Sequence, residues 1–120
     1  MPATGVFYGL KTCSTCRAAK KHLASRGVFV DERPIREAPP DRESLRRWMT
    51  GPSLKPYLNT SSQDYRDRGL SGRELSVDEA LDEIEACPNL LKRPLTVWGD
   101  EAEFGYREAR FDARIDALGG

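Results

Sequence analysis

The stretch Cys13-Ser14-Thr15-Cys16 decides the fold, because an apolar run stands before it and a helical pattern follows it. The run Gly5–Gly9 predicts a strand, and residues 14–26 predict a helix that ends at Gly27. A thiolate at a helix N-terminus faces unpaired backbone N–H groups and the positive end of the helix dipole, and both lower its pKa. The second Cys lies one helical turn later, on the same side, within reach of a disulfide.

A strand, a Cys-x-x-Cys motif and a helix in this order are typical of a thioredoxin-like redox site, so we expect Cys13 and Cys16 to form a redox or nucleophilic pair. Two other interpretations stay open. One is half of a zinc site, but a closed site needs about four ligands and only Cys87 and His22 remain. The other is two unrelated structural thiols. We expect His22 on a solvent-facing helix surface and Cys87 as a buried core thiol.

Composition limits the possible functions. The chain has 120 residues, which suits a single domain over 1–120. Its 19 basic and 19 acidic residues balance, and no basic stripe indicates direct binding of nucleic acid. The sequence has no apolar stretch of membrane-spanning length and no signal-peptide pattern at its start. An odd number of cysteines argues against a secreted disulfide scaffold, so we expect a cytoplasmic protein, and we expect it to be a monomer.

The rest of the chain predicts three further parts. Residues 28–30 predict a short buried strand, parallel to the first, which completes a βαβ unit. Residues 37–92 are polar and helical, with a helix opening at 39–43, short helical turns over 53–72, and a capping box of Ser76 and Glu79 before a helix that buries Val77 and ends at Pro88.

The last third predicts a strand over 94–98, a turn over 99–101, a return strand over 103–106 and a terminal helix. The helix carries its apolar side chains at helical spacing: Phe111, Ile115 and Leu118. The predicted fold class is therefore α/β, a thioredoxin-like mixed sheet (βαβ…ββα) with a helical insertion over residues 37–92 between its halves.

Five segments together resemble the arsenate reductase–like (ArsC/Spx) family of thioredoxin-fold proteins, and the resemblance covers nearly the whole chain. They are residues 8–17 with both cysteines, 39–43, 57–61, 90–95 and 104–106. The family includes glutaredoxin-coupled arsenate reductases and Spx-type transcriptional regulators. The pair Arg93-Pro94 is the second anchor, because the resemblance implies that Pro94 follows a cis peptide bond and faces the cysteine site.

The resemblance also implies a nucleophile and an oxyanion site. Cys13 matches the family nucleophile, and Arg93 matches one of three arginines that hold the oxyanion in the family's arsenate reductases. Asn59 fills the position of the first arginine, and the third position falls at or beside Tyr106. With one arginine clearly kept, an oxyanion with two negative charges would miss much of its charge-assisted hydrogen bonding.

Other cations could replace the missing arginines. Arg107, Arg73 and Lys11 are the candidates for that replacement. Arg17 either stabilises the thiolate or is a solvated helix residue. The expected substrate-binding set is Arg93, Pro94, Asn59, Lys11 and Arg17.

Cys16 gives the chain an internal resolving thiol, which resembles the Spx-type members and the small reductase-like members of the family. The glutaredoxin-coupled arsenate reductases generally rely on an external thiol instead. The resemblance implies a cytosolic thiol–disulfide oxidoreductase in which Cys13 attacks a small-molecule oxyanion or a disulfide and Cys16 resolves the adduct. Glutathione, glutaredoxin or thioredoxin would supply the reducing equivalents, with no bound cofactor or metal. The alternative is an Spx-type redox-sensing transcriptional regulator that binds RNA polymerase.

Overall fold

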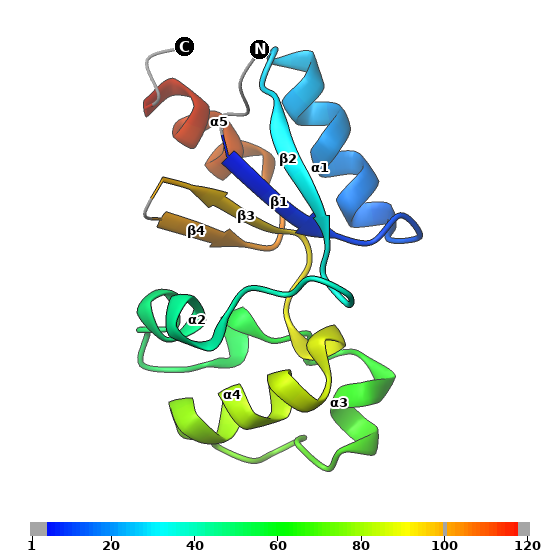
Figure 1. Ribbon diagram of the computed structural model, residues 1–120, viewed down its shortest axis with the longest axis vertical. Helices are drawn as coiled ribbons and strands as arrows, with labels where there is room; N and C mark the ends of the chain where they lie inside the picture. Colours follow the sequence, from blue (N-terminus) through cyan, green and yellow to red (C-terminus); the bar gives the residue numbers. More distant parts are fainter. Residues whose placement is uncertain (1–4, 100, 118–120) are drawn as a thin grey trace. The chain divides into compact units, whose positions relative to one another are not determined.

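The computed structural model describes residues 5–99 and 101–117, and these fall into two compact units. The sheet unit contains the described residues of Met1–Pro34 and Arg93–Gly120, and the helical unit is Ile35–Lys92 (Figure 1). Leu118, which the sequence places on the terminal helix, and the predicted turn residue Asp100 lie outside the described residues.

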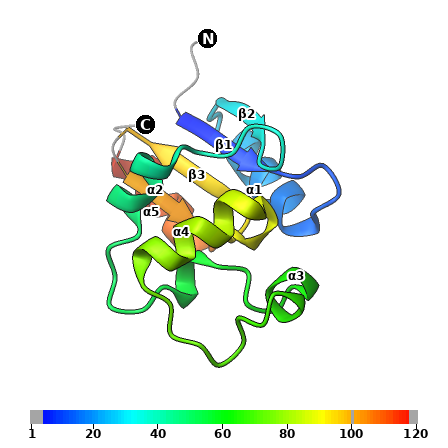
Figure 2. The ribbon, with the colours of Figure 1, turned by 60° about the horizontal axis from the view of Figure 1, so that its bottom comes forward.

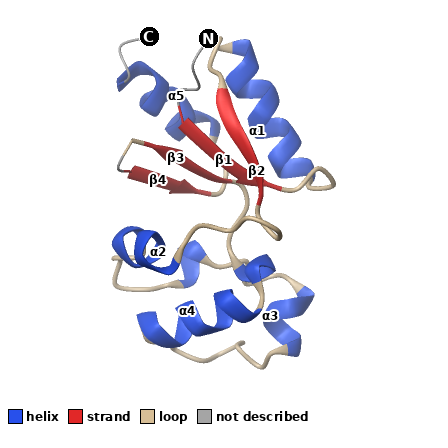
Figure 3. Cartoon of the chain, in the orientation of Figure 1, coloured by secondary structure: helices blue, strands red, loops and turns tan. Residues whose placement is uncertain are grey.

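The sheet unit is built on four strands in the order β2-β1-β3-β4 (Figure 3). Their bounds are β1 Gly5–Gly9, β2 Val30–Pro34, β3 Leu95–Trp98 and β4 Glu101–Phe104. β1 pairs in parallel with β2 and antiparallel with β3, and β3 pairs antiparallel with β4. The predicted mixed sheet with βαβ…ββα order is therefore confirmed.

Two predicted strands are displaced. The sequence places a buried strand at 28–30, but β2 begins at Val30, and its residues from Asp31 onward are exposed. The prediction followed the apolar run, whereas the ladder runs along the edge of the sheet, where charged side chains can stay in water. The return strand is predicted over 103–106 and lies at Glu101–Phe104, because Gly99 turns the chain with a φ of 61°.

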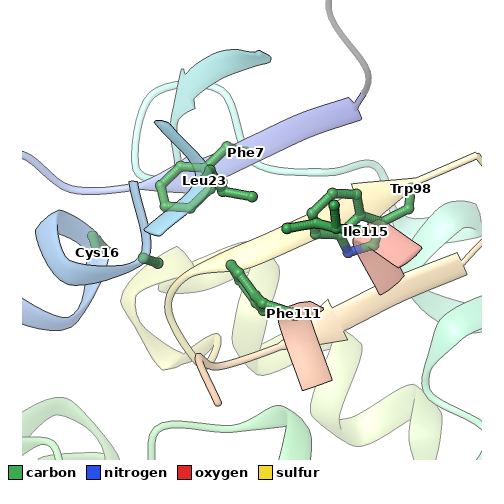
Figure 4. Packing of buried hydrophobic residues seen from close by; sticks show 7 residues of the cluster. Phe7, Cys16, Leu23, Trp98, Phe111 and Ile115 are labelled. Carbon is green, nitrogen blue, oxygen red and sulfur yellow. The ribbon is translucent and has the colours of Figure 1, made fainter. Parts of the chain in front are cut away.

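Helices α1 (Ser14–Ser25) and α5 (Glu108–Ala117) contribute side chains to one core cluster with the sheet. Figure 4 shows Phe7 of β1 and Trp98 of β3 beside side chains from both helices. The buried members are Phe7, Cys16, Ala19, Leu23, Trp98, Phe111 and Ile115. The ring of Phe111 meets the Trp98 ring edge-on, with the centroids 5.7 Å apart, a geometry that aromatic pairs favour.

The helical unit contains α2 (Arg42–Trp48), α3 (Gln63–Asp67) and α4 (Val77–Ala86), which Figure 2 shows from below, with 3-10 turns at Lys55–Tyr57 and Pro88–Leu90. The predicted capping box of Ser76 and Glu79 is confirmed, as are the short helical turns over 53–72. Val77 is half-buried rather than buried, because the apolar face of α4 is formed by Ala80, Leu81 and Ile84.

Ion pairs join α2 to α4. The Arg42 guanidinium lies 2.8 Å from carboxylate oxygens of both Asp82 and Glu85. These pairs are exposed to water and contribute little to stability, so the buried leucines of the unit dominate it. Within the described residues, no helix has the length and apolar character needed to cross a membrane.

Phe111→Ala should destabilise the fold by about 3–5 kcal/mol, because Phe111 is fully buried and its removal leaves a cavity between α5 and β3. Phe29→Ala is the matched control, since Phe29 is 54% exposed and its removal should change stability by less than about 0.5 kcal/mol. Urea unfolding followed by circular dichroism measures both variants. If Phe111→Ala and Phe29→Ala lowered the free energy of unfolding equally, the core would not be where the structure places it.

Candidate active site

Cys13 is the N-cap residue of α1 and therefore stands where the strand β1 passes into the helix. The Cys13 N–H donates to the Leu10 carbonyl at 3.2 Å, which closes the turn after β1. The Cys16 backbone N–H donates to the Cys13 Sγ at 3.4 Å, so the thiol takes the place that a Ser or Asp side chain usually fills at a helix start. The predicted helix start at Ser14 is confirmed.

This position lowers the pKa of the Cys13 thiol. Burial of the half-exposed side chain opposes ionisation, but the hydrogen bonds from the Cys16 thiol and backbone N–H outweigh it. The positive charge of Arg93 and the backbone N–H of Thr15 lower the pKa further. Cys13 is thus more acidic than a free thiol and is accessible to a reagent.

Cys16 has the opposite character. Its side chain is 1% exposed within the core cluster, and this burial raises its pKa to about 11. A hydrogen bond from the Leu10 backbone N–H and the charge of Arg93 act in the other direction, and the neighbouring Cys13 raises the pKa further. At neutral pH the buried thiol keeps its proton while the accessible thiol is the readier to lose its own.

Arg93 and Pro94 lie at the start of β3, in the same unit as the two cysteines. The peptide bond between them is cis, as the family resemblance implies. Pro94 is buried, and its carbonyl accepts a hydrogen bond from the Gly105 N–H at 2.8 Å. The backbone around Arg93 is therefore fixed, and the guanidinium charge acts on both thiols.

Arg17 and Lys11 flank the cysteines and are both exposed. The Arg17 guanidinium donates to the Lys11 carbonyl at 3.0 Å, so it holds the loop that leads from β1 to Cys13. Binding of substrate by either residue stays a prediction.

Asn59 and Arg73 belong to the helical unit. The Asn59 N–H donates to the Leu90 carbonyl at 2.8 Å, and its side-chain oxygen accepts from the Ser61 hydroxyl. Arg73 pairs with Glu79 at 3.5 Å. A substrate-binding role for Asn59 stays a prediction.

The prediction that Cys87 is a buried core thiol is wrong, because Cys87 is half-buried. Helix α4 ends at Ala86, ahead of Pro88, and Cys87 becomes its C-terminal cap, with its N–H donating to the Glu83 carbonyl. The chain therefore leaves the helical path one residue before Pro88, and Cys87 does not continue the buried face formed by Ile84.

The prediction that His22 lies on a solvent-facing helix surface is wrong, because its side chain is only 9% exposed. Its Nε2 lies 2.7 Å from the Asp112 carboxylate, and its Nδ1 lies 2.7 Å from the Tyr106 hydroxyl. The hydrogen bond from His22 and the charge of Arg26 outweigh desolvation and lower the pKa of Asp112. A carboxylate can only accept, so Nε2–H donates to Asp112, and Nδ1 shares a second hydrogen bond with the Tyr106 hydroxyl.

The sequence offers no local signal for this group, because Tyr106 and Asp112 are 84 and 90 residues away along the chain. It also bears on the family's third arginine position. The Tyr106 hydroxyl is held by His22, and the Tyr106 ring packs edge-on against Phe111, with centroids 4.8 Å apart. Arg107 is exposed, and its carbonyl accepts from the Phe111 N–H.

The zinc interpretation finds no ligand set in the part of the chain that the structure describes. No three His, Cys, Asp or Glu side chains there are grouped so that they could hold a metal ion. His22 in particular is bound to Tyr106 and Asp112.

A mixed sheet that places an acidic thiol at the start of α1 and a cis-proline at the start of β3 defines a thioredoxin-fold thiol protein. Within that class, the model of the ArsC family matches residues 8–114, which is most of the chain. The chain therefore belongs to the ArsC family, as its sequence motifs indicate.

Proteins with different names are similar to this chain. YusI of Bacillus subtilis (strain 168) is 37% identical over 110 residues, which cover 88% of this chain and 93% of YusI. The regulatory protein MgsR of the same organism is 30% identical, with 83% of this chain and 81% of MgsR covered. A crystal structure described as a possible arsenate reductase from Streptococcus mutans UA159 superposes with a TM-score of 0.84 and 38% identity, over 93% of this chain and 98% of that one.

Arg93→Ala should raise the apparent pKa of Cys13, because the guanidinium charge favours the thiolate. The pH dependence of iodoacetamide alkylation, with the modified residue identified by peptide mass mapping, measures this pKa. Arg107→Ala is the matched control, since it removes one exposed arginine from the same unit. A pKa that stays unchanged in Arg93→Ala, or that rises equally in the control, would contradict the role of Arg93.

Proposed function

We propose that this protein is a thiol–disulfide oxidoreductase in which Cys13 attacks a disulfide substrate and Cys16 resolves the intermediate. The observation that carries this proposal is the contrast between two thiols one helical turn apart. Cys13 is accessible and its pKa is lowered, whereas Cys16 is buried and its pKa is raised to about 11. Two thiols with a purely structural role would not require pKa values shifted in opposite directions.

The two thiols divide the reaction into two exchanges. The Cys13 thiolate attacks one sulfur of the substrate, forms a mixed disulfide and releases the other half of the substrate as a thiolate. Cys16 then loses its proton and attacks the Cys13 sulfur, which forms the Cys13–Cys16 disulfide and releases the second half. A thiol reductant such as glutathione, glutaredoxin or thioredoxin returns the pair to the dithiol by two further exchanges.

The side chains at the family's oxyanion positions support a disulfide over an arsenate-type oxyanion. Of the three arginine positions, only that of Arg93 clearly keeps an arginine. Asn59 fills the first position, and the third falls at or beside Tyr106, with Arg107 one place later. The Tyr106 hydroxyl is already bound to His22. A dianion would lack the bidentate, charge-assisted contacts that arginines supply, whereas a disulfide carries no charge at the reacting sulfurs.

A redox-sensing regulator is the second candidate, because the chain is 30% identical to a regulatory protein over 83% of its length. In that function the Cys13–Cys16 disulfide would be the signal rather than a turnover intermediate. The family resemblance supplies RNA polymerase as the partner to test.

The test is turnover of a small disulfide and of arsenate, each with glutathione–glutaredoxin and with thioredoxin as the reductant. We expect disulfide reduction in the wild type and in Cys87→Ser, no reduction in Cys13→Ser, and a trapped mixed disulfide in Cys16→Ser. Mass spectrometry of the intact protein identifies the trapped adduct. Cys87→Ser is the matched control because it removes the one thiol outside the motif.

Two results would overturn the proposal. Arsenate turnover that exceeds disulfide turnover, and rises further in Asn59→Arg, would make the protein an arsenate reductase. Negligible turnover of both substrates, together with binding of RNA polymerase in one redox state only, would establish the regulator instead.

A further inference from the structure

Gly9, the last residue of β1, lies directly against the resolving thiol. A Cβ atom added to Gly9 would stand 3.1 Å from the Cys16 Sγ and 3.5 Å from the Cys16 Cβ. It would also stand 3.0 Å from Cε1 of Phe7, and both closest distances are shorter than nearly all real contacts of a Cβ atom. A side chain at residue 9 would therefore occupy space that the thiol now fills.

Space, rather than backbone conformation, accounts for a glycine here. Gly27, Gly69, Gly72 and Gly99 have positive φ angles, and nothing lies within 4 Å of an added Cβ at any of them. Gly9 is not among the residues with positive φ and pairs with Pro34 in the parallel ladder of β1 and β2. The backbone conformation of residue 9 would suit an alanine. The Cβ atom of that alanine would be too close to Cys16 and Phe7.

The residue after Gly9 supplies a backbone N–H that acts on the Cys16 sulfur. The Leu10 N–H hydrogen-bonds the Cys16 sulfur and favours its thiolate, against the effect of burial. Arg93 and Cys13 are the charged or titratable groups that act on Cys16, and Tyr106 packs against the same core cluster. Of the other buried side chains in that cluster, only Trp98 carries a polar atom, its indole Nε1.

We propose that Gly9 and the Leu10 N–H form a seat for the resolving thiol: Gly9 is a positioning residue whose missing side chain leaves the space that the Cys16 sulfur occupies beside the Leu10 backbone. This inference rests on the proposed function, because it concerns the second of the two exchanges. The last residue of β1 would then position the resolving thiol, in addition to leading the chain into the Cys-x-x-Cys motif.

A methyl group at residue 9 would move the thiol away from its donor. Cys16 is 1% exposed and surrounded by the core cluster, so its sulfur has little room to retreat inward. The strand has little freedom either, because β1 lies between β2 and β3. The Cys16 thiolate then loses its hydrogen bond, and Cys13 loses the hydrogen bond from the Cys16 thiol. The Cys16 and Thr15 backbone N–H groups and the Arg93 charge still act on Cys13.

The aromatic disulfide 5,5′-dithiobis(2-nitrobenzoate) separates the two exchanges. The Cys13 thiolate attacks it, forms a mixed disulfide and releases one coloured thiolate. The Cys16 thiolate then attacks the Cys13 sulfur, closes the Cys13–Cys16 disulfide and releases the second. Stopped-flow absorbance of full-length protein carrying Cys87→Ser follows both releases without a contribution from the third thiol.

In Gly9→Ala we expect the first release to slow less than the second, because Cys13 keeps the Cys16 and Thr15 backbone N–H groups and the charge of Arg93. The second release should slow by about tenfold, the change in thiolate fraction that one pKa unit produces, and its pH midpoint should rise. The matched control is Ala80→Val, which crowds a fully buried residue of α4 in the helical unit and should leave both releases unchanged. If Gly9→Ala does not fold, Gly9→Ala with Phe7→Leu removes the second contact and keeps the one with Cys16.

If the rate of the second release is unchanged in a folded Gly9→Ala variant, the proposed positioning role of Gly9 is wrong. Equal slowing of both releases, or the same slowing in Ala80→Val, would overturn it as well, because the effect would then be general destabilisation. The absence of a second release from the wild type would instead overturn the proposed function. The two failures are therefore distinguishable in one experiment.

Discussion

The hydrogen bond from the Cys16 N–H to the Cys13 Sγ is the interaction on which the sheet unit and its chemistry both depend. It caps α1 with a thiol instead of a hydroxyl or a carboxylate. Because the cap fixes where the helix begins, it also fixes which residues face the sheet, namely Cys16, Ala19 and Leu23. One turn of helix thereby directs the first thiol toward solvent and the second into the core.

The other end of α1 is held as firmly as the first. His22 and Arg26 both bind the Asp112 carboxylate at 2.7 Å, and Arg26 also binds Asp116 at 2.8 Å. These bonds tie α1 to α5, and the Phe111 ring packs between them and Trp98. Because α1 is fixed at both ends, its N-terminus stays in place while Cys13 changes its covalent partner. Exchange between neighbouring thiols requires such a fixed geometry.

Much of this arrangement could be predicted from the sequence. The strand, the motif and the helix are adjacent in the chain, so local patterns suffice for β1, α1 and the capping role of Cys13. The cis bond before Pro94 follows from family resemblance and not from local chemistry. The contact of the Tyr106 hydroxyl with His22 does not follow from the resemblance.

What the sequence could not predict depends on tertiary contacts. His22 stands on a helix rich in charge, and only α5 and the segment before it, brought from the far end of the chain, bury its ring. Strand β2 runs through charged residues because an edge strand needs only one partner, and an apolar-run rule therefore placed it too early. Cys87 follows an apolar helix face, but the helix stops before reaching it.

The central claim is that one turn of helix gives two neighbouring thiols opposite acidities. A pH titration of the reduced protein, with the ¹³Cβ chemical shift of each cysteine followed by NMR, measures both directly. We expect Cys13 to titrate below a free thiol and Cys16 well above it. Titration of Cys16 first, or of both thiols at the value of a free cysteine, would contradict it.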